Sequence, residues 1–152
     1  MQRVFAALAV ERVRRYLGLE RESGERFIAS RGPVEWLASF APVGLAEIRA
    51  FVAGAASTVD LDEEAIVALA SGLSAVLRLY AELGFQSFNL AIHGAAAGPE
   101  GFVVLRVVAR AYFGALQRSD VMWSQRLQAE TATDLKPEAV AERARELFAL
   151  AA

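Results

Sequence analysis

The chain has 152 residues, a formal net charge of −2 and no cysteine. This length suits one domain with a sizeable core, and the missing cysteine excludes disulfides, thiolate catalysis and cysteine-ligated metal. A slightly acidic balance argues against nonspecific nucleic-acid binding, which needs a basic surface. Charges interrupt every apolar run before the ~20 residues of a membrane span, and the N terminus lacks the residue order of a secretory signal. We therefore expect a cytoplasmic protein without nucleic-acid or membrane partners.

The N-terminal part of the chain predicts a helix followed by strands. Apolar residues recur at helical spacing over about residues 3–17, and Gly18 is the expected stop. A charged loop is expected over 19–25 and a short strand over 26–30. Apolar and other residues alternate over 34–40, which indicates a half-buried strand, and 45–52 suits a partner strand or a short helix.

The clearest element is a helix over 61–83. Asp60 and Glu63 resemble a capping box at its start, and Gly84 follows its end. The apolar stripe of this helix comprises Leu69, Leu73, Val76, Leu77, Tyr80 and Leu83.

The remaining segments predict a hairpin and a last helix. Strands are expected over 87–93 and 102–110, with Phe88, Leu90 and Ile92 facing the core. A short helix or irregular segment follows over 119–130, and a final helix starts at Pro137. The fold class is therefore α+β, an antiparallel sheet with a long helix across one face and helices at each end.

The hairpin also carries the candidate ligand-binding residues. Because residues two apart in a strand share a face, Asn89 and His93 could share one polar surface with Arg106 and Arg110. Two guanidinium groups with an amide and an imidazole suit a phosphate or a sugar diphosphate. The alternative is a solvated sheet face on which Arg110 pairs with an acid such as Asp120.

The segment Ser87–His93, a loop of about eight residues and a strand ending in Ala109-Arg110 resemble the C-terminal half of galactose-1-phosphate uridylyltransferases. More broadly, they are similar to the histidine-triad (HIT-like) superfamily. The resemblance extends over about residues 25–148. It implies a single HIT-like domain over 1–152, with the helix of about 3–17 in front.

The same resemblance places apolar residues at the catalytic positions. When Ala109-Arg110 is laid on the Pro-Arg ending of the transferase strand, Phe102 and Val104 take the places of its histidines and Arg106 that of its acid. His93, the one histidine of the chain, falls on the pocket wall. Covalent nucleotidyl transfer needs an imidazole nucleophile, so no catalytic residue, metal site or cofactor is predicted.

Three functions follow as expectations. The first is a degenerate, noncatalytic domain that binds a nucleotide, a sugar phosphate or a partner subunit, either a second copy or a missing N-terminal half. The second is a structural dimerisation module that uses Phe102, Val104 and Val108 as an apolar contact. The third, ranked lowest, is a residual enzyme with His93 as general base. A further alternative is a fragment of an active nucleotidyltransferase whose catalytic half is missing, because the sequence decides neither the ligand nor whether the chain is part of a longer protein.

Overall fold

The computed structural model describes residues 2–95, 101–110 and 135–150. It has a five-stranded sheet in which every neighbouring pair is antiparallel. In spatial order the strands are β1 (Phe27–Arg31), β2 (Val34–Ala38), β3 (Leu45–Ala53), β5 (Phe102–Arg110) and β4 (Ser87–Ala95). The predicted α+β class and the predicted hairpin are both confirmed. The segment 119–130 and Asp120 lie outside the described residues.

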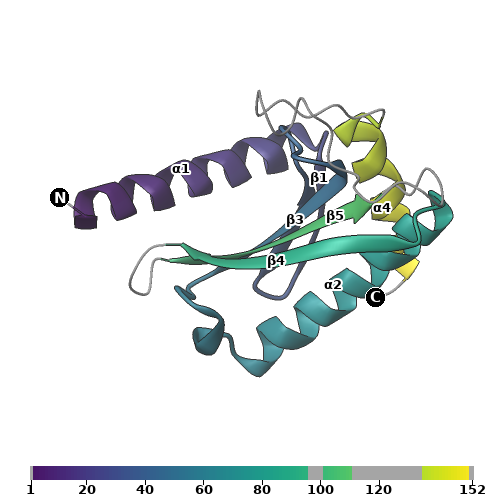
Figure 1. Ribbon diagram of the computed structural model, residues 1–152. Helices are drawn as coiled ribbons and strands as arrows, with labels where there is room; N and C mark the ends of the chain where they lie inside the picture. Colours follow the sequence, from purple (N-terminus) through teal and green to yellow (C-terminus); the bar gives the residue numbers. More distant parts are fainter. Residues whose placement is uncertain (1, 96–100, 111–134, 151–152) are drawn as a thin grey trace, which may run out of the picture.

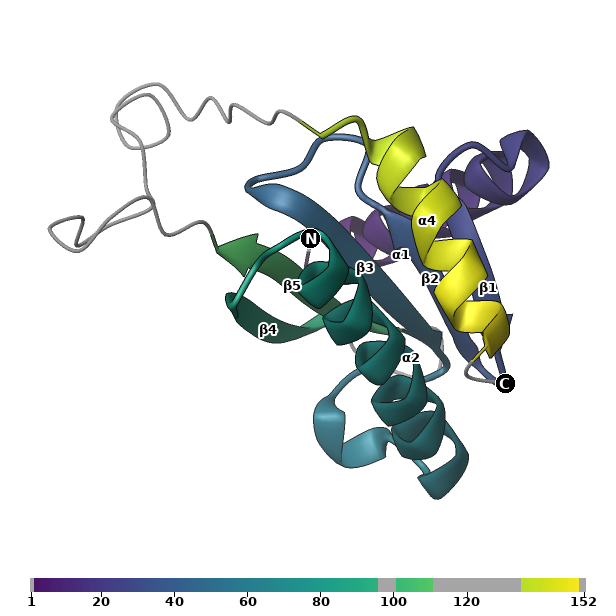
Figure 2. The same ribbon diagram turned by 90° about the vertical axis from the view of Figure 1, so that its right-hand side faces the viewer.

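Helices cover both faces of the sheet (Figures 1 and 2). Helices α2 (Glu63–Glu82) and α4 (Pro137–Leu150) lie side by side on one face, and α1 (Gln2–Ser23) lies on the other. We call the first the core face and the second the α1 face. The described structure thus has three layers where the sequence predicted a helix across only one face.

The core face holds the larger apolar cluster. The Trp36 indole lies in its centre, against the Phe148 ring at a centroid distance of 5.4 Å and against the α2 backbone at Gly72. The Tyr80 hydroxyl donates to the carbonyls of Ala46 and Val107, at 2.8 and 2.9 Å. Burial raises the pKa of this phenol, so it remains a neutral donor. These contacts fix α2 against β2, β3 and β5.

The α1 face carries a second apolar cluster, made by Val10, Leu17, Leu37, Phe51 and Phe102. Leu37 lies on the face of β2 opposite to Trp36, and it is fully buried because α1 covers it. Phe102 is likewise buried, and Val104 packs against the same cluster. The expectation that Phe102 and Val104 form an exposed dimer contact is therefore wrong: the first helix of the same chain occupies that surface.

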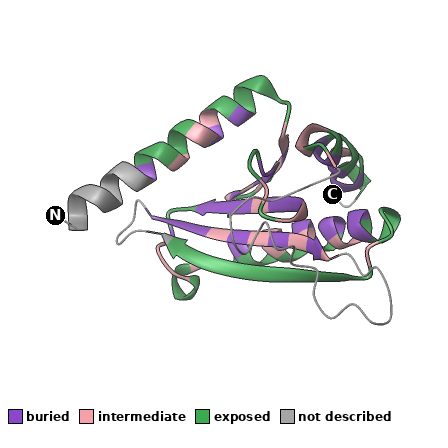
Figure 3. Ribbon diagram, turned by 45° about the horizontal axis from the view of Figure 1, so that its top comes forward, coloured by how far each residue is buried: buried purple, intermediate pink, exposed green. Residues whose placement is uncertain are grey.

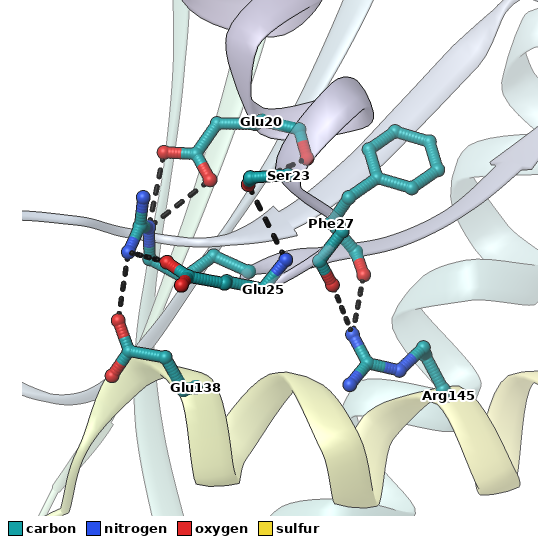
Figure 4. Close-up of polar contacts among 8 residues, drawn as sticks. Glu20, Ser23, Glu25, Phe27, Glu138 and Arg145 are labelled. Atoms are coloured by element: carbon teal, nitrogen blue, oxygen red, sulfur yellow. Dashed lines mark hydrogen bonds and ion pairs between the residues drawn. The ribbon is translucent and has the colours of Figure 1, made fainter.

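Helix α1 continues past its predicted end at Gly18 and stops at Ser23. Gly24 follows with a φ of +67°, and its N–H bonds to the Glu20 carbonyl at 3.0 Å, a glycine-ended helix terminus. The last turn is helical because the buried Glu20 carboxylate receives Arg26 Nε at 3.0 Å. Arg26, the residue before β1, also bonds to Glu138 of α4 at 2.7 Å and so ties the end of α1 to the C-terminal helix. Figure 4 shows Glu20 and Glu138 in this network.

Helix α2 begins two residues later than predicted. Asp62 is its N-cap and accepts from the Ala65 N–H at 2.8 Å. Asp60 instead ends the short 3-10 helix η1 (Thr58–Asp60) and accepts from Ala56 N–H. Within the described residues α2 is the one helix long and apolar enough to cross a membrane, yet its buried positions, Ala65, Gly72, Ala75, Val76, Leu79 and Tyr80, pack in the core.

Strand β4 lies at the open edge of the sheet. Its Phe88, Leu90 and Ile92 share the core face with Ala109, Val107 and Leu105 of β5. They are nevertheless 41, 40 and 45% exposed. On this core face α2 and α4 pack over β1, β2 and β3, and they leave β4 uncovered. Figure 3 colours β4 as exposed along its length. The prediction that these side chains are buried is wrong, although the predicted face is correct.

Candidate phosphate-binding face

The four predicted ligand-binding residues do share one face of the hairpin. The register pairs Asn89 with Val108, His93 with Val104, Ala91 with Arg106 and Ser87 with Arg110. Opposed residues point to the same side of an antiparallel sheet. All four candidates therefore project from the α1 face, as the strand spacing predicted.

They do not converge on one point. Asn89 is the diagonal neighbour of both Arg106 and Arg110, within the ~7–8 Å over which long side chains interact across strands. His93 instead lies opposite Val104, six residues along the strand from the position of Arg110. At about 3.4 Å per residue, roughly 20 Å separates these two backbone positions. Within one chain, a phosphate held by Asn89 and Arg110 lies too far from His93 to contact it, although His93 is the diagonal neighbour of Arg106.

A buried carboxylate holds the centre of this face. The Glu47 side chain is fully buried, and its Oε1 lies 2.6 Å from Arg49 Nε and 3.1 Å from Arg106 Nε. Its Oε2 accepts the Val43 N–H at 2.6 Å. Because β3 and β5 pair Arg49 directly with Arg106, one negative charge stands between two positive ones. A surplus of one positive charge remains there.

Arg110 lies four residues from Arg106 on the same face of β5, with Val108 between them on that face. The loop before β3 lies against the residue between them, since a side chain at Gly44 would meet Val108 Cγ1 at 2.4 Å. Asn89, Arg106 and Arg110 thus form a partly exposed patch with positive charge and an amide. We call these three residues the Asn89 patch.

Tyr16 of α1 packs on Phe51, next to this patch, with ring centroids 6.4 Å apart. Burial, assisted by the Glu20 carboxylate, raises the pKa of the Tyr16 phenol. Its hydroxyl therefore stays protonated at neutral pH and adds no negative charge to the α1 face.

Phe102 and Val104, which the resemblance placed at the positions of triad histidines, belong to the apolar cluster under α1. Phe102 is 3% exposed, and Val104 contacts the same group of side chains. Neither side chain can attack a phosphorus atom or donate a proton. Among the described residues, no group of three or more histidine, cysteine, aspartate or glutamate side chains is placed to hold a metal ion.

Sequence reasoning missed Glu47 and Arg49, the residues that anchor Arg106. A signal was present, because an acid and a base two apart in a strand share a face and can meet charges on the next strand. The pairing of β3 with β5 rather than with β2 alone was needed to bring Arg49 opposite Arg106. This neighbour relation depends on the order of the strands in the sheet, which the side-chain pattern of a single strand does not specify.

The chain matches none of the protein-family models searched. It is 28% identical over 134 residues to an uncharacterised protein of Archaeoglobus fulgidus, covering 84% of this chain and 38% of that protein. Structurally it resembles uridylyltransferase, with a TM-score of 0.65 and 14% identity over 89% of this chain and 45% of that one. It also resembles a uridylyltransferase mutant, with a TM-score of 0.66 and 15% identity over 83% of this chain and 44% of that one. This chain therefore spans less than half the length of these relatives.

A third similar structure is close to this chain in length. It is a zinc-bound histidine triad family protein from Mycobacterium smegmatis, with a TM-score of 0.57, 14% identity and coverage of 89% of this chain and 92% of that one. At this identity the likeness establishes architecture, which is the one that the Ser87–His93 and Phe102–Arg110 strands predicted. The chain has the HIT-like fold that uridylyltransferase and histidine triad proteins share.

Proposed function

We propose that the chain is a noncatalytic HIT-like domain that binds a phosphate-bearing small molecule, a nucleotide or a sugar phosphate, at the Asn89 patch. The observation that carries this proposal is the cationic surplus of the patch. Glu47 neutralises only one of Arg49 and Arg106, which both lie beside it, and Arg110 projects from the same face of β5. Guanidinium groups pair with phosphate oxygens in a forked geometry, and an amide supplies a further donor.

We expect binding without transfer because the α1 face presents apolar side chains where the resemblance places the triad histidines. The residues at the triad positions, Phe102 and Val104, contact the apolar cluster that α1 covers. A ligand held at Asn89 and Arg110 would find no nucleophile at these two positions, because Phe102 and Val104 carry hydrocarbon side chains. The domain would then hold a phosphate compound, while any reaction would need groups from another chain or domain.

The test is isothermal titration of the folded chain with UMP, AMP and a UDP-hexose. We expect Arg110→Ala and Asn89→Ala to weaken binding, the arginine variant at least tenfold, since a charged hydrogen bond contributes about 1.5–3 kcal/mol. Arg78→Ala is the matched control, because Arg78 is an exposed arginine on α2, away from the α1 face. The proposal would be refuted if none of the three compounds gave heat of binding. It would also be refuted if Arg78→Ala weakened binding as much as Arg110→Ala.

A second candidate function is a structural, partner-binding module. The observation that favours it is the uncovered edge strand β4, with three large apolar side chains 40–45% exposed. Exposed apolar strips of this kind commonly mark interaction surfaces. The surface predicted for such a module comprised Phe102, Val104 and Val108 of β5, whereas the exposure of β4 favours the edge of the sheet.

A further inference from the structure

The Glu47 carboxylate reaches the α1 face because β3 is irregular at this point. The register of β3 against β5 shifts between Leu45 and Ile48. Two β3 residues, Ala46 and Glu47, therefore oppose one residue of β5, which is a β-bulge that can re-aim a side chain. Ala46 has a φ of +47°, a left-handed conformation that residues with a side chain rarely adopt. Leu45 packs against the core cluster, whereas Glu47, two residues later, lies on the α1 face with its ion-pair partners. Backbone strain of this kind is found preferentially at functional sites.

Glu47 is surrounded by cationic groups that carry more N–H donors than one carboxylate can accept. Its Oε1 receives the Nε–H groups of both Arg49 and Arg106, and its Oε2 receives the backbone N–H of Val43. Arg106 Nη2 lies 3.0 Å from the same Oε1 but makes no hydrogen bond, although it is buried. Among the described residues, the terminal nitrogens of Arg49 have no hydrogen-bond partner. The two guanidinium groups therefore have N–H donors left for a further acceptor.

The arginine pair is held in place but stays accessible. Arg49 and Arg106 are directly opposed on β3 and β5, and their side chains are 26 and 28% exposed. Like charges at opposed strand positions repel each other, and Glu47 offsets only one of them. An anion at this position would remove the remaining repulsion. Because both Nε atoms are already bonded to one buried oxygen, less side-chain freedom would be lost when the anion binds.

We infer that Arg49 and Arg106, positioned by Glu47, bind the terminal phosphate of a phosphate monoester and discriminate against phosphodiesters. This inference rests on the proposed function and extends its site from the Asn89 patch to Arg49. A monoester phosphate has three terminal oxygens and close to two negative charges at neutral pH. A phosphodiester has only two free oxygens and one charge, so it satisfies fewer of the donors. Asn89 and Arg110 would contact the same ligand from β4 and from farther along β5.

The first test compares UMP with cyclic 3′,5′-UMP, which has the same base and ribose but a phosphodiester. By isothermal titration we expect the unmodified chain to bind UMP at least tenfold more tightly. Arg49→Ala should weaken UMP binding at least tenfold and cyclic UMP binding less, so the discrimination falls. Arg49→Lys should remain at least threefold weaker for UMP, because an ammonium group lacks the guanidinium fork. Arg143→Ala is the matched control, since Arg143 also bonds to two carboxylates, those of Glu82 and Glu146, but lies on α4.

The positioning role of Glu47 is tested with two variants that circular dichroism first shows to be folded. Glu47→Gln removes a negative charge, which alone would strengthen anion binding, and Glu47→Asp keeps the charge but withdraws the carboxylate by one methylene group. We expect both variants to bind UMP at least threefold more weakly. In the ligand-free chain, NMR of labelled arginine side chains should show slow exchange of the Arg49 and Arg106 Nε–H groups with water, and faster exchange in both variants.

The outcomes separate this inference from the proposed function. Equal affinity for UMP and cyclic UMP, or UMP binding that Arg49→Ala leaves unchanged, would overturn the inference while the proposed function stands. Unchanged or tighter UMP binding by both Glu47 variants would overturn the positioning role. If the unmodified chain binds neither compound, the proposed function fails, and the inference fails with it.

Discussion

At the scale of single residues, two helical glycines have opposite roles. Gly72 lies in α2 where a Cβ atom would come within 2.3 Å of the Trp36 ring, whose position is fixed by the core. Gly18 lies in α1 with nothing within 4 Å of its Cβ position. Both share the low helix propensity of glycine, but only one of them is required by packing.

We expect Gly72→Ala to destabilise the protein by about 1–3 kcal/mol, the usual cost of overpacking a core. Gly18→Ala should stabilise it by about 0.4–1 kcal/mol, because alanine suits a helix interior and restricts the unfolded chain. Urea denaturation of the two variants measures both free energies of unfolding. A stabilising Gly72→Ala would show that α2 does not sit against Trp36 as described.

The same scale explains which site residues the sequence could predict. The alternation along β4 and β5 placed Asn89 and Arg106 on one face, and the register confirms it. The sequence alone did not indicate Glu47, because its ion pair with Arg106 forms only when β3 pairs with β5. The side-chain period identifies a face, but it does not identify the neighbours on that face.

At the scale of elements, α1 determines what the α1 face can do. Its apolar residues Val10 and Leu17 cover Phe51 and Phe102, and its end is held by the Glu20–Arg26–Glu138 network. Arg145 of α4 supports the same corner by donating to the carbonyls of Gly24 and Phe27, at 3.0 and 2.8 Å (Figure 4). The turn between α1 and β1 is thus held by contacts with the last turn of α1 and with α4.

This network predicts a dependence of stability on acid. The hydrogen bond from Arg26 lowers the pKa of Glu138 below its ordinary value of 4.5. A carboxyl with a depressed folded-state pKa stabilises the fold above its unfolded pKa, and that stabilisation is lost as pH falls through the folded value. The loss should therefore begin near pH 4.5 and continue below it.

Glu138→Gln should accordingly reduce the loss of stability between pH 6 and about pH 3, as followed by urea denaturation at each pH. Glu142→Gln, at an exposed position of the same helix, provides the control and should follow the unmodified chain. Parallel pH profiles for the unmodified chain and Glu138→Gln would show that the contact with Arg26 does not contribute.

Element boundaries were the weaker part of the sequence prediction. The sequence predicts that the first helix ends at Gly18, but Leu17 and Glu20 are both buried, and their burial keeps the last turn helical. Gly24, which does end it, adopts a φ of +67°. The terminal helix from Pro137 was predicted correctly, because its Val140, Ala144, Leu147 and Phe148 follow the helical period and all are buried.

At the scale of the whole molecule, the order of the elements was sufficient to predict an α+β fold, and the resemblance carried by residues 87–93 and 102–110 indicated the HIT-like one. Neither was sufficient to predict which surfaces are covered. The sequence placed Phe88 and Leu90 in a core and left Phe102 for a subunit contact, whereas the three-layer arrangement reverses these assignments. Helix placement and strand order decide burial at this scale, and neither follows from the side-chain period of a single strand.

The central claim is that this HIT-like domain binds a phosphate compound at Asn89, Arg106 and Arg110 without transferring it. NMR titration of the isotope-labelled chain with UMP tests its location most directly. The account predicts that the largest amide shifts fall on residues 87–91 and 106–110, with UMP recovered unchanged. Shifts confined to the opposite side of the sheet, over α2 and α4, or UMP consumed during the titration, would contradict it.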